Sequence, residues 1–309
     1  MDFQLTDDQR ALKAGVRELL AARFGRERLR AAVDEGPRLD RALWRELGEA
    51  GFFALRLPEA DGGVGLGLPE TVLAFEEAGR VLLPGPLVAT HLAAGVVDGA
   101  ATGETVVTAV DGGGLVEWLT EADVVRGDAT CAEPLRSVDP LTPLHRVPVP
   151  EGAGLTGVRP TGSTGALPTA YLTSLLTAAE QLGGAARTCE AAVQHARTRE
   201  QFGQPIGAFQ AVKHLCARML VRVEVARAAV YAAAVTADPV DIAAARLLAD
   251  EAAVRGARDC LQVHGGMGFT WESDVHLHLK RSWARTQRAG AATESEELLA
   301  VDLVAGVGR

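Results

Sequence analysis

Two glycine-containing blocks in the second half of the chain carry the residues best suited to holding an anionic ligand. The first block runs Arg199-Glu-Gln-Phe-Gly-Gln-Pro-Ile-Gly-Ala-Phe-Gln-Ala-Val-Lys-His214, and the second runs Gln262-Val-His-Gly-Gly-Met-Gly-Phe-Thr270. Arginine donates paired hydrogen bonds to phosphate oxygens, and a helix start adds free N–H groups. Glycines let a backbone approach a large ligand. The pattern fits a pyrophosphate site, although each block alone also fits a solvated arginine or an ordinary turn.

Long amphipathic helices must position these blocks. Between them, apolar residues step by three and four, which predicts one seam of a helix bundle: Phe209, Val212, Cys216, Met219, Val223, Ala226 and Val230. Pro239 should end this helix, and Asp241 is the expected cap of the next, which continues from Ile242 to Leu261. A further helix is expected from about Ala170 to the first block.

The rest of the chain divides by composition into a helical part and a short β part. Thr6-x-x-Gln9 is a possible capping box, and Gly51 should stop a helix that carries Leu43 to Ala50. After Thr105 the segments are short and β-branched, with an edge strand expected at Arg146-Val-Pro-Val-Pro. We therefore predict a mainly α protein in three domains: an N-terminal helical domain (1–103), a shortened β domain (104–161) and a C-terminal four-helix bundle (162–309).

Composition excludes several functions. The chain has 309 residues, 48% of them hydrophobic, and a net charge of -9, which argues against a nucleic-acid surface. No apolar run approaches the roughly 20 residues that a membrane span needs, and the acidic start does not resemble a signal peptide. Four cysteines (Cys131, Cys189, Cys216 and Cys260) lie far apart, which predicts buried thiols in a reducing compartment. We therefore expect a cytoplasmic protein.

The two blocks resemble the FAD-binding signatures of the acyl-CoA dehydrogenases, R-x-Q-F-G-x-P-I-x-x-F-Q-A-V followed two helices later by Q-x-x-G-G-x-G-F. The N-terminal half is similar to the same family at Met1-Asp-Phe, at the loop Leu57-Pro-Glu-x-x-Gly-Gly-x-Gly and at Glu76-Glu-Ala-Gly-Arg80. The similarity covers about four fifths of the chain and is weakest in the middle. It implies the three-domain fold above and an α,β-dehydrogenation of acyl-CoA thioesters.

The resemblance also implies a set of cofactor contacts. These residues would contact the adenosine-diphosphate half of FAD across a dimer interface: Arg199, Phe202, Gln210, Gln262, Val263, Gly265 and Gly266. The flavin itself would be held mainly by the neighbouring subunit.

The sequence departs from the family where the family places its catalytic carboxylate. The family base removes the α-proton of the substrate and must be an Asp or Glu. Alignment of Thr293 on the family threonine puts Ala291 at this position, and a second family position falls near Thr173. Neither residue can act as a base. Glu294 or Glu296 could substitute only if the register slips, and glutamates at a helix start more often serve the helix dipole.

The β segment is also about half the family length and lacks the loop that covers flavin and substrate in the family. We therefore expect a subunit of a heteromeric FAD-dependent dehydrogenase, an α2β2 assembly in which a second acyl-CoA dehydrogenase-type chain carries the base. An electron-transfer flavoprotein or a similar acceptor would take the electrons. Two alternatives stay open: a self-sufficient homo-oligomer that uses Glu294 or Glu296, and a flavin-free or repurposed member that acts on a carrier-bound acyl group. The histidines lack metal-site spacing, so no metal is expected.

Overall fold

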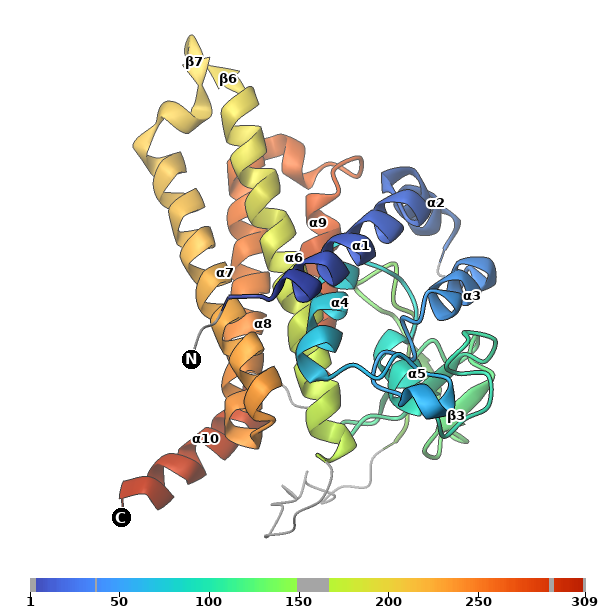
Figure 1. The fold of residues 1–309 in the computed structure, drawn as a ribbon. Helices are drawn as coiled ribbons and strands as arrows, with labels where there is room; N and C mark the ends of the chain where they lie inside the picture. Colours follow the sequence, from blue (N-terminus) through green and yellow to red (C-terminus); the bar gives the residue numbers. More distant parts are fainter. Residues whose placement is uncertain (1–3, 37, 149–166, 289–291, 308–309) are drawn as a thin grey trace.

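The structure is a computed structural model that describes residues 4–36, 38–148, 167–288 and 292–307. Its N-terminal part is helical (Figure 1). The predicted capping box at its start is confirmed, because the Thr6 hydroxyl accepts from the Gln9 N–H at 3.2 Å and the Gln9 side chain accepts from the Thr6 N–H at 3.1 Å. The elements are α1 (Asp7–Arg23), α2 (Arg26–Glu35), α3 (Arg41–Glu49), the short helix η1 (Glu59–Asp61), α4 (Leu68–Arg80) and α5 (Leu87–Ala93).

The β region consists of two small sheets. β1 (Val107–Ala109) pairs in parallel with β3 (Val124–Arg126), and an antiparallel sheet has the order β2 (Leu115–Glu117), β5 (Leu144–Arg146), β4 (Glu133–Leu135). The prediction of an edge strand at Arg146-Val-Pro-Val-Pro is wrong for Arg146, because β5 ends at this residue and pairs on both sides; Val149 and Pro150 lie outside the described residues. The edge strands of this sheet are β2 and β4, and β4 contains a proline, which cannot donate a ladder hydrogen bond.

The C-terminal part is a bundle of long helices joined by short connections. The predicted seam of α7 is confirmed, since Met219, Val223, Ala226 and Val230 are buried. Asp241 is not the cap of α8, because Pro239 occupies the first turn and Asp238 accepts from the N–H groups of Val240 and Asp241. The elements are α6 (Thr169–Thr198), β6 (Glu200–Gln201), β7 (Gln204–Pro205), η2 (Ile206–Ala208), α7 (Gln210–Thr236), α8 (Pro239–His264), η3 (Gly265–Phe269), α9 (Val275–Thr286) and α10 (Ala292–Val307).

Glycines bring the N-terminal part into direct backbone contact with the bundle. A Cβ on Gly183 of α6 would lie 1.9 Å from the Glu76 carbonyl oxygen, and one on Gly79 of α4 would lie 2.0 Å from the Glu180 carbonyl oxygen. Only glycine allows the two helices to cross this closely. α4 therefore packs along α6 as part of one continuous core (Figure 1).

The cysteine prediction is only partly right. Cys189 and Cys260 are buried and Cys216 is partly buried, but Cys131 is exposed because it lies in the loop before the edge strand β4. No helix among the described residues is both long enough and apolar enough to cross a membrane.

Candidate cofactor-binding site

The free end of the bundle brings the two sequence blocks together. The β6–β7 hairpin, which joins α6 to α7, lies at the same end as the C-terminus of α8 and the η3 turn (Figure 1). The imidazole of His195 on α6 stacks on that of His264 on α8, with ring centroids 4.1 Å apart. Two segments more than 60 residues apart in sequence thus share one surface. From the sequence, the histidines are excluded only as metal ligands, and this stacked pair is not foreseen.

Arg199 forms the base of the hairpin through its backbone. Its N–H donates to the His195 carbonyl and its carbonyl accepts from the Ile206 N–H, both at 2.8 Å. Its side chain is exposed and makes no hydrogen bond or ion pair with any described residue. Burial lowers the pKa of His195, and the charges of His264 and Arg199 lower it further. This end of the bundle therefore has an exposed arginine available for an anion.

The Phe202 side chain is exposed to solvent, and its backbone conformation is strained. The residue has a φ of 56° and its side chain is 92% exposed, with only an edge-on contact to Phe209 at 6.0 Å between ring centroids. A positive φ costs free energy in a residue that is not glycine, and such strain often marks a binding surface. Gln210 follows as the first residue of α7, and no side chain caps that helix start. The first-turn N–H groups of α7 therefore remain available to an anion.

The second block leaves space for a ligand. A Cβ on Gly265 or Gly266 would meet nothing within 4 Å, so packing within the described chain does not explain these glycines, although Gly265 has a φ of 61° that favours glycine. Gln262 is exposed beside them. Val263 is different, since its side chain is 6% exposed and lies in the hydrophobic core. Only the backbone of Val263 is available to a cofactor.

The N-terminal helix α2 holds the loop that follows this block. Arg26 pairs with Asp274 at 2.5 Å and donates to the Glu272 carbonyl at 2.9 Å. The Trp271 indole N–H donates to Asp34 at 3.1 Å, and Arg30 lies over the same indole ring. Sequence reasoning missed this contact. The detectable signal was the spacing of Arg26, Arg30 and Asp34, which places the three side chains on one face of a helix.

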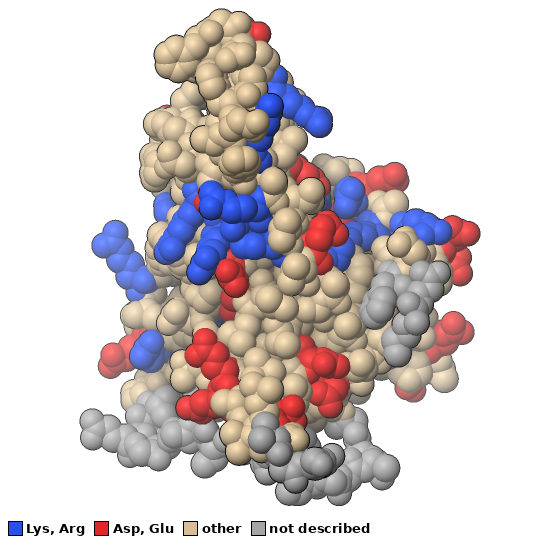
Figure 2. Space-filling view, turned by 90° about the vertical axis from the view of Figure 1, so that its left-hand side faces the viewer, with Lys and Arg blue, Asp and Glu red and all other residues tan. Residues whose placement is uncertain are grey.

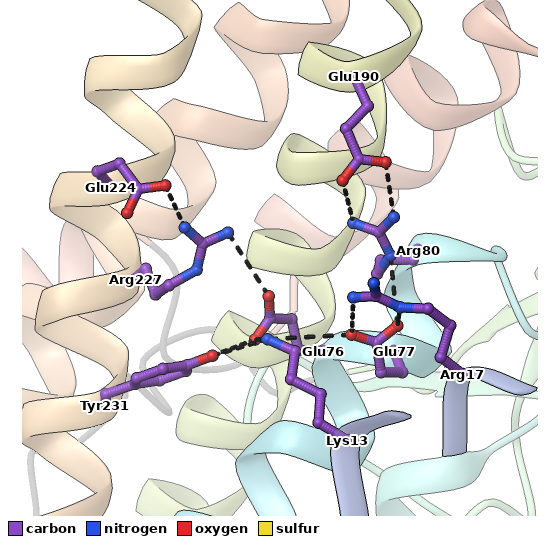
Figure 3. A network of polar contacts seen from close by, with 9 residues as sticks. All are labelled: Lys13, Arg17, Glu76, Glu77, Arg80, Glu190, Glu224, Arg227 and Tyr231. Atoms are coloured by element: carbon purple, nitrogen blue, oxygen red, sulfur yellow. Dashed lines mark hydrogen bonds and ion pairs between the residues drawn. The ribbon is translucent and has the colours of Figure 1, made fainter. Parts of the chain in front are cut away.

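The buried Glu76-Glu77 pair of α4 is fully engaged in ion pairs (Figure 3). Glu76 accepts from Lys13 at 2.6 Å and from the Tyr231 hydroxyl at 2.7 Å, and Glu77 accepts two hydrogen bonds from Arg17 at 2.7 and 2.8 Å. Burial and the neighbouring Glu76 carboxylate raise the pKa of Tyr231. The cluster ties α1 and α7 to α4, and neither glutamate is free to take a substrate proton.

The two positions predicted to correspond to the family base, Thr173 and Ala291, are not carboxylates. The Thr173 hydroxyl donates to the Thr169 carbonyl at 2.9 Å, so it is a helix-bound hydroxyl. Ala291 lies outside the described residues. Glu294 and Glu296 lie at the start of α10, and the Glu296 side chain is exposed. Carboxylates at this position interact favourably with the positive end of the helix dipole.

The junction between the β region and the bundle is filled by buried charges. Arg285 pairs with Glu117 at 2.6 Å and with Glu180 at 3.0 Å, and Arg288 pairs with Asp111 at 2.8 Å. Burial would raise the pKa of Glu117, but Arg285 and Arg288 outweigh it and lower the pKa; in Glu180 burial prevails and raises the pKa. The cavity beside Glu180 and Arg285 measures about 10 Å³, space for one water molecule.

Surface charge is unevenly distributed on the side that α7 occupies. Figure 2 shows basic side chains gathered across the middle of this face and acidic ones lower down. α7 itself carries Arg218, Arg222 and Arg227. Two of these arginines are compensated, since Arg222 pairs with Asp259 and Arg227 pairs with Glu224, whereas Arg218 is exposed. Among the residues that the structure describes, no cluster of histidine, cysteine and carboxylate side chains could hold a metal ion.

Comparison with known proteins agrees with this geometry. The family described as "Acyl-CoA dehydrogenase, N-terminal domain" matches residues 6–105, and "Acyl-CoA dehydrogenase, C-terminal domain" matches residues 164–294. Acyl-CoA dehydrogenase IpdE2 of Mycobacterium tuberculosis is 34% identical over 302 residues, which cover 91% of this chain and 92% of that protein. Benzylmalonyl-CoA dehydrogenase of Aromatoleum aromaticum is 29% identical, covering 91% and 93% of the two chains.

A solved structure extends the comparison to the fold. A chain of the ChsE4-ChsE5 complex from Mycobacterium tuberculosis superposes with a TM-score of 0.82 at 26% identity, covering 98% of this chain and 99% of that one. The helical N-terminal part, the small β region and the C-terminal bundle are thus all shared. The chain belongs to the acyl-CoA dehydrogenase family of flavoprotein oxidoreductases.

Proposed function

We propose that this chain is the base-lacking subunit of a heteromeric FAD-dependent acyl-CoA dehydrogenase. The observation that carries the proposal is the exposure of Phe202 and Arg199 at the free end of the bundle, where no described part of the chain pairs with either side chain apart from Phe209. Such a half-site becomes complete when a second chain presents the rest of the flavin. The second chain would also supply the catalytic glutamate.

The residues at this end fit the adenosine-diphosphate half of FAD. Arg199 would pair with the pyrophosphate, and the uncapped start of α7 at Gln210 would add backbone N–H groups. Phe202 would contact the adenosine through its exposed ring, and Gln262 with Gly265 and Gly266 would line the same end. When bound, FAD accepts the hydride that leaves the β-carbon of the acyl group.

The buried junction supports a division of labour between two chains. In the family the middle domain covers flavin and substrate, whereas here its shortened equivalent is joined to the bundle by Arg285 of α9 and by Arg288, which follows that helix; they pair with Glu117 and Asp111. A site packed with paired charges leaves no room for a flavin ring within this part of the chain. The absence of a carboxylate at Thr173 and Ala291 supports the same division.

The proposed assembly is an α2β2 tetramer with two flavins, in the cytoplasm, acting on acyl-CoA and passing electrons to an electron-transfer flavoprotein or similar acceptor. The structural match to a chain of a two-component complex supports a partner subunit. Within the proposed subunit, residues 1–103 form the N-terminal helical domain, residues 104–161 the shortened β domain and residues 162–309 the C-terminal bundle. The free end of the bundle belongs to the last of these.

Flavin counting during co-expression tests the proposal. The chain is produced alone and with an acyl-CoA dehydrogenase-type chain encoded beside it, and sedimentation mass is combined with the flavin-to-protein ratio. We expect one FAD per heterodimer, and no bleaching of flavin by acyl-CoA in preparations of this chain alone. A stable homotetramer with one FAD in every subunit would exclude the heteromer.

A further inference from the structure

We propose that a cavity between the α1–α2 corner and the bundle binds a compact anion, a carboxylate or phosphate carried on a small apolar body. The cavity measures about 420 Å³, within the range of small-molecule sites. Its wall contains Gly25 and Arg26 from the corner, Arg187 from α6 and Asp274 at the start of α9. None of the predicted cofactor contacts lines it, but His264, which lies between two of them in sequence, does.

Arg187 supplies the available positive charge. Three arginines line the cavity, but Arg26 is paired with Asp274 at 2.5 Å and Arg80 with Glu190 at 2.6 Å. Arg187 has an exposed side chain and makes no hydrogen bond or ion pair with any described residue. A cation that the chain leaves unpaired at the edge of a cavity favours an anionic occupant.

Two helix starts add to this preference. α2, which has 10 residues, begins in the cavity wall after Gly25, and α9, with 12 residues, begins there after Asp274. Neither cap residue bonds its helix N–H groups through a side chain, but the Ser273 hydroxyl accepts from the Val275 N–H at 3.4 Å. Free first-turn N–H groups and the positive dipole end stabilise an anion. Asp274 is neutralised by Arg26 and Arg30, and the Glu272 side chain faces solvent.

A buried imidazole also lines the cavity. His278 is only 8% exposed, and its Nδ1 atom, which has no hydrogen-bond partner in the described structure, lies toward Gly184 and the neighbouring cavity of about 10 Å³. Burial lowers the pKa of His278 to about 3, and Arg187, Arg281 and Arg80 lower it further. The imidazole is therefore neutral in a positive field that a bound anion would relieve.

Apolar residues form the remaining wall and set the character of the ligand. Phe24, Leu29 and Val275 are buried, and Val81 and Ala191 are partly buried. A free inorganic ion would leave this apolar surface in contact with water. A small ring or branched chain that carries the anionic group would cover it and gain hydrophobic free energy.

Matched probes test both halves of the site on the assembled, full-length protein. Calorimetric titration with cyclohexanecarboxylate is compared with the neutral cyclohexanecarboxamide and with inorganic phosphate. Arg187→Gln removes the available cation, and Arg197→Gln is the control, because Arg197 is another exposed arginine of α6 that lines a separate groove against α7. Ala191→Phe fills the cavity without a change of charge.

We expect cyclohexanecarboxylate to bind at least tenfold more tightly than the carboxamide. Arg187→Gln should weaken carboxylate binding at least fivefold and leave the carboxamide unchanged, Ala191→Phe should abolish both, and Arg197→Gln should alter neither. Equal binding of carboxylate and carboxamide, or an unchanged Arg187→Gln variant, would overturn the anion site. Binding of phosphate alone would overturn the apolar half. These titrations need neither flavin nor turnover, so they are independent of the proposed function.

Discussion

An arginine at the junction of the bundle with the β region and an arginine at the free end of the bundle differ in their surroundings. At the junction with the β region, Arg285 is buried and contacts both Glu117 and Glu180. At the free end, Arg199 is exposed and its guanidinium has no partner in the described structure. The same side chain thus completes a core in one place and is left available in the other.

The difference lies in how each charge is compensated. A buried guanidinium must be paired within its own chain, because an isolated charge in the interior is strongly unfavourable. An exposed one is solvated and carries no such requirement, so it stays available to a ligand or a partner chain. Pairing, rather than residue type, separates the arginines of the scaffold from those of the half-site.

The largest expected effect comes from removing the buried arginine. Arg285→Met leaves two carboxylates buried without their shared cation and should destabilise the fold by about 3–5 kcal/mol. Chemical denaturation monitored by circular dichroism measures the loss. The triple variant Arg285→Met, Glu117→Gln, Glu180→Gln removes all three charges and should recover part of it.

An Arg285→Met protein as stable as the wild type would contradict this account of the junction. It would mean that Glu117 and Glu180 are satisfied in some other way, for example by Arg288, which lies 3.0 Å from Glu117. The comparison with Arg199 would then lose its basis.

The sequence singled out the residues of the proposed half-site but not those of the buried junction, for a physical reason. Arg199, Phe202 and Gly265 belong to contiguous motifs, and a local motif can be read from a single stretch of chain. Glu117 and Arg285 are 168 residues apart and carry no motif. Only the helical spacing of Arg281, Arg285 and Arg288 signalled one charged face that would need buried acids.

The same limit explains the errors in the fold. The α7 seam was predictable because its period of three to four residues is local. Whether β5 lies at an edge or in the middle of its sheet depends on two strands elsewhere in the chain, so Arg146 was misassigned. The role of Val263 was similarly undecidable, since the motif does not reveal which side of the helix faces the core.

Acidification should lower the free energy of unfolding, because the buried regions disfavour a further positive charge. Burial lowers the pKa of His91 to about 4, with Arg56 adding to the shift, and that of His278 to about 3, against 6.5 in the unfolded chain. The folded protein favours the neutral form of both imidazoles. The stability that this preference contributes is therefore complete above pH 6.5 and is lost as the pH falls from there towards each folded pKa. Between pH 7 and 5 the two histidines should together cost roughly 4 kcal/mol.

Denaturation curves at pH 7, 6 and 5 measure this slope, in a range where most carboxylates stay ionised. His91→Phe removes one of the two protons taken up on unfolding while keeping a ring against Phe75, and should remove about half of the slope. A His91→Phe slope equal to that of the wild type would show that His91 is not buried as a neutral ring.

The smallest change in fold stability, and the most specific functional effect, is expected from Arg199→Ala. Its guanidinium has no described partner, so the free energy of unfolding should change by less than about 0.5 kcal/mol. In the assembled complex the variant loses a charged hydrogen bond to the FAD pyrophosphate, which costs about 1.5–3 kcal/mol and weakens FAD binding by roughly tenfold or more. Fluorescence titration of the apo-complex with FAD measures this loss.

Arg197→Ala, two residues earlier and also exposed, is the matched control and should bind FAD normally. Equal FAD affinity of the Arg199 variant and the wild type would place Arg199 among ordinary solvated arginines, whereas selective loss would assign the free end of the bundle to the cofactor.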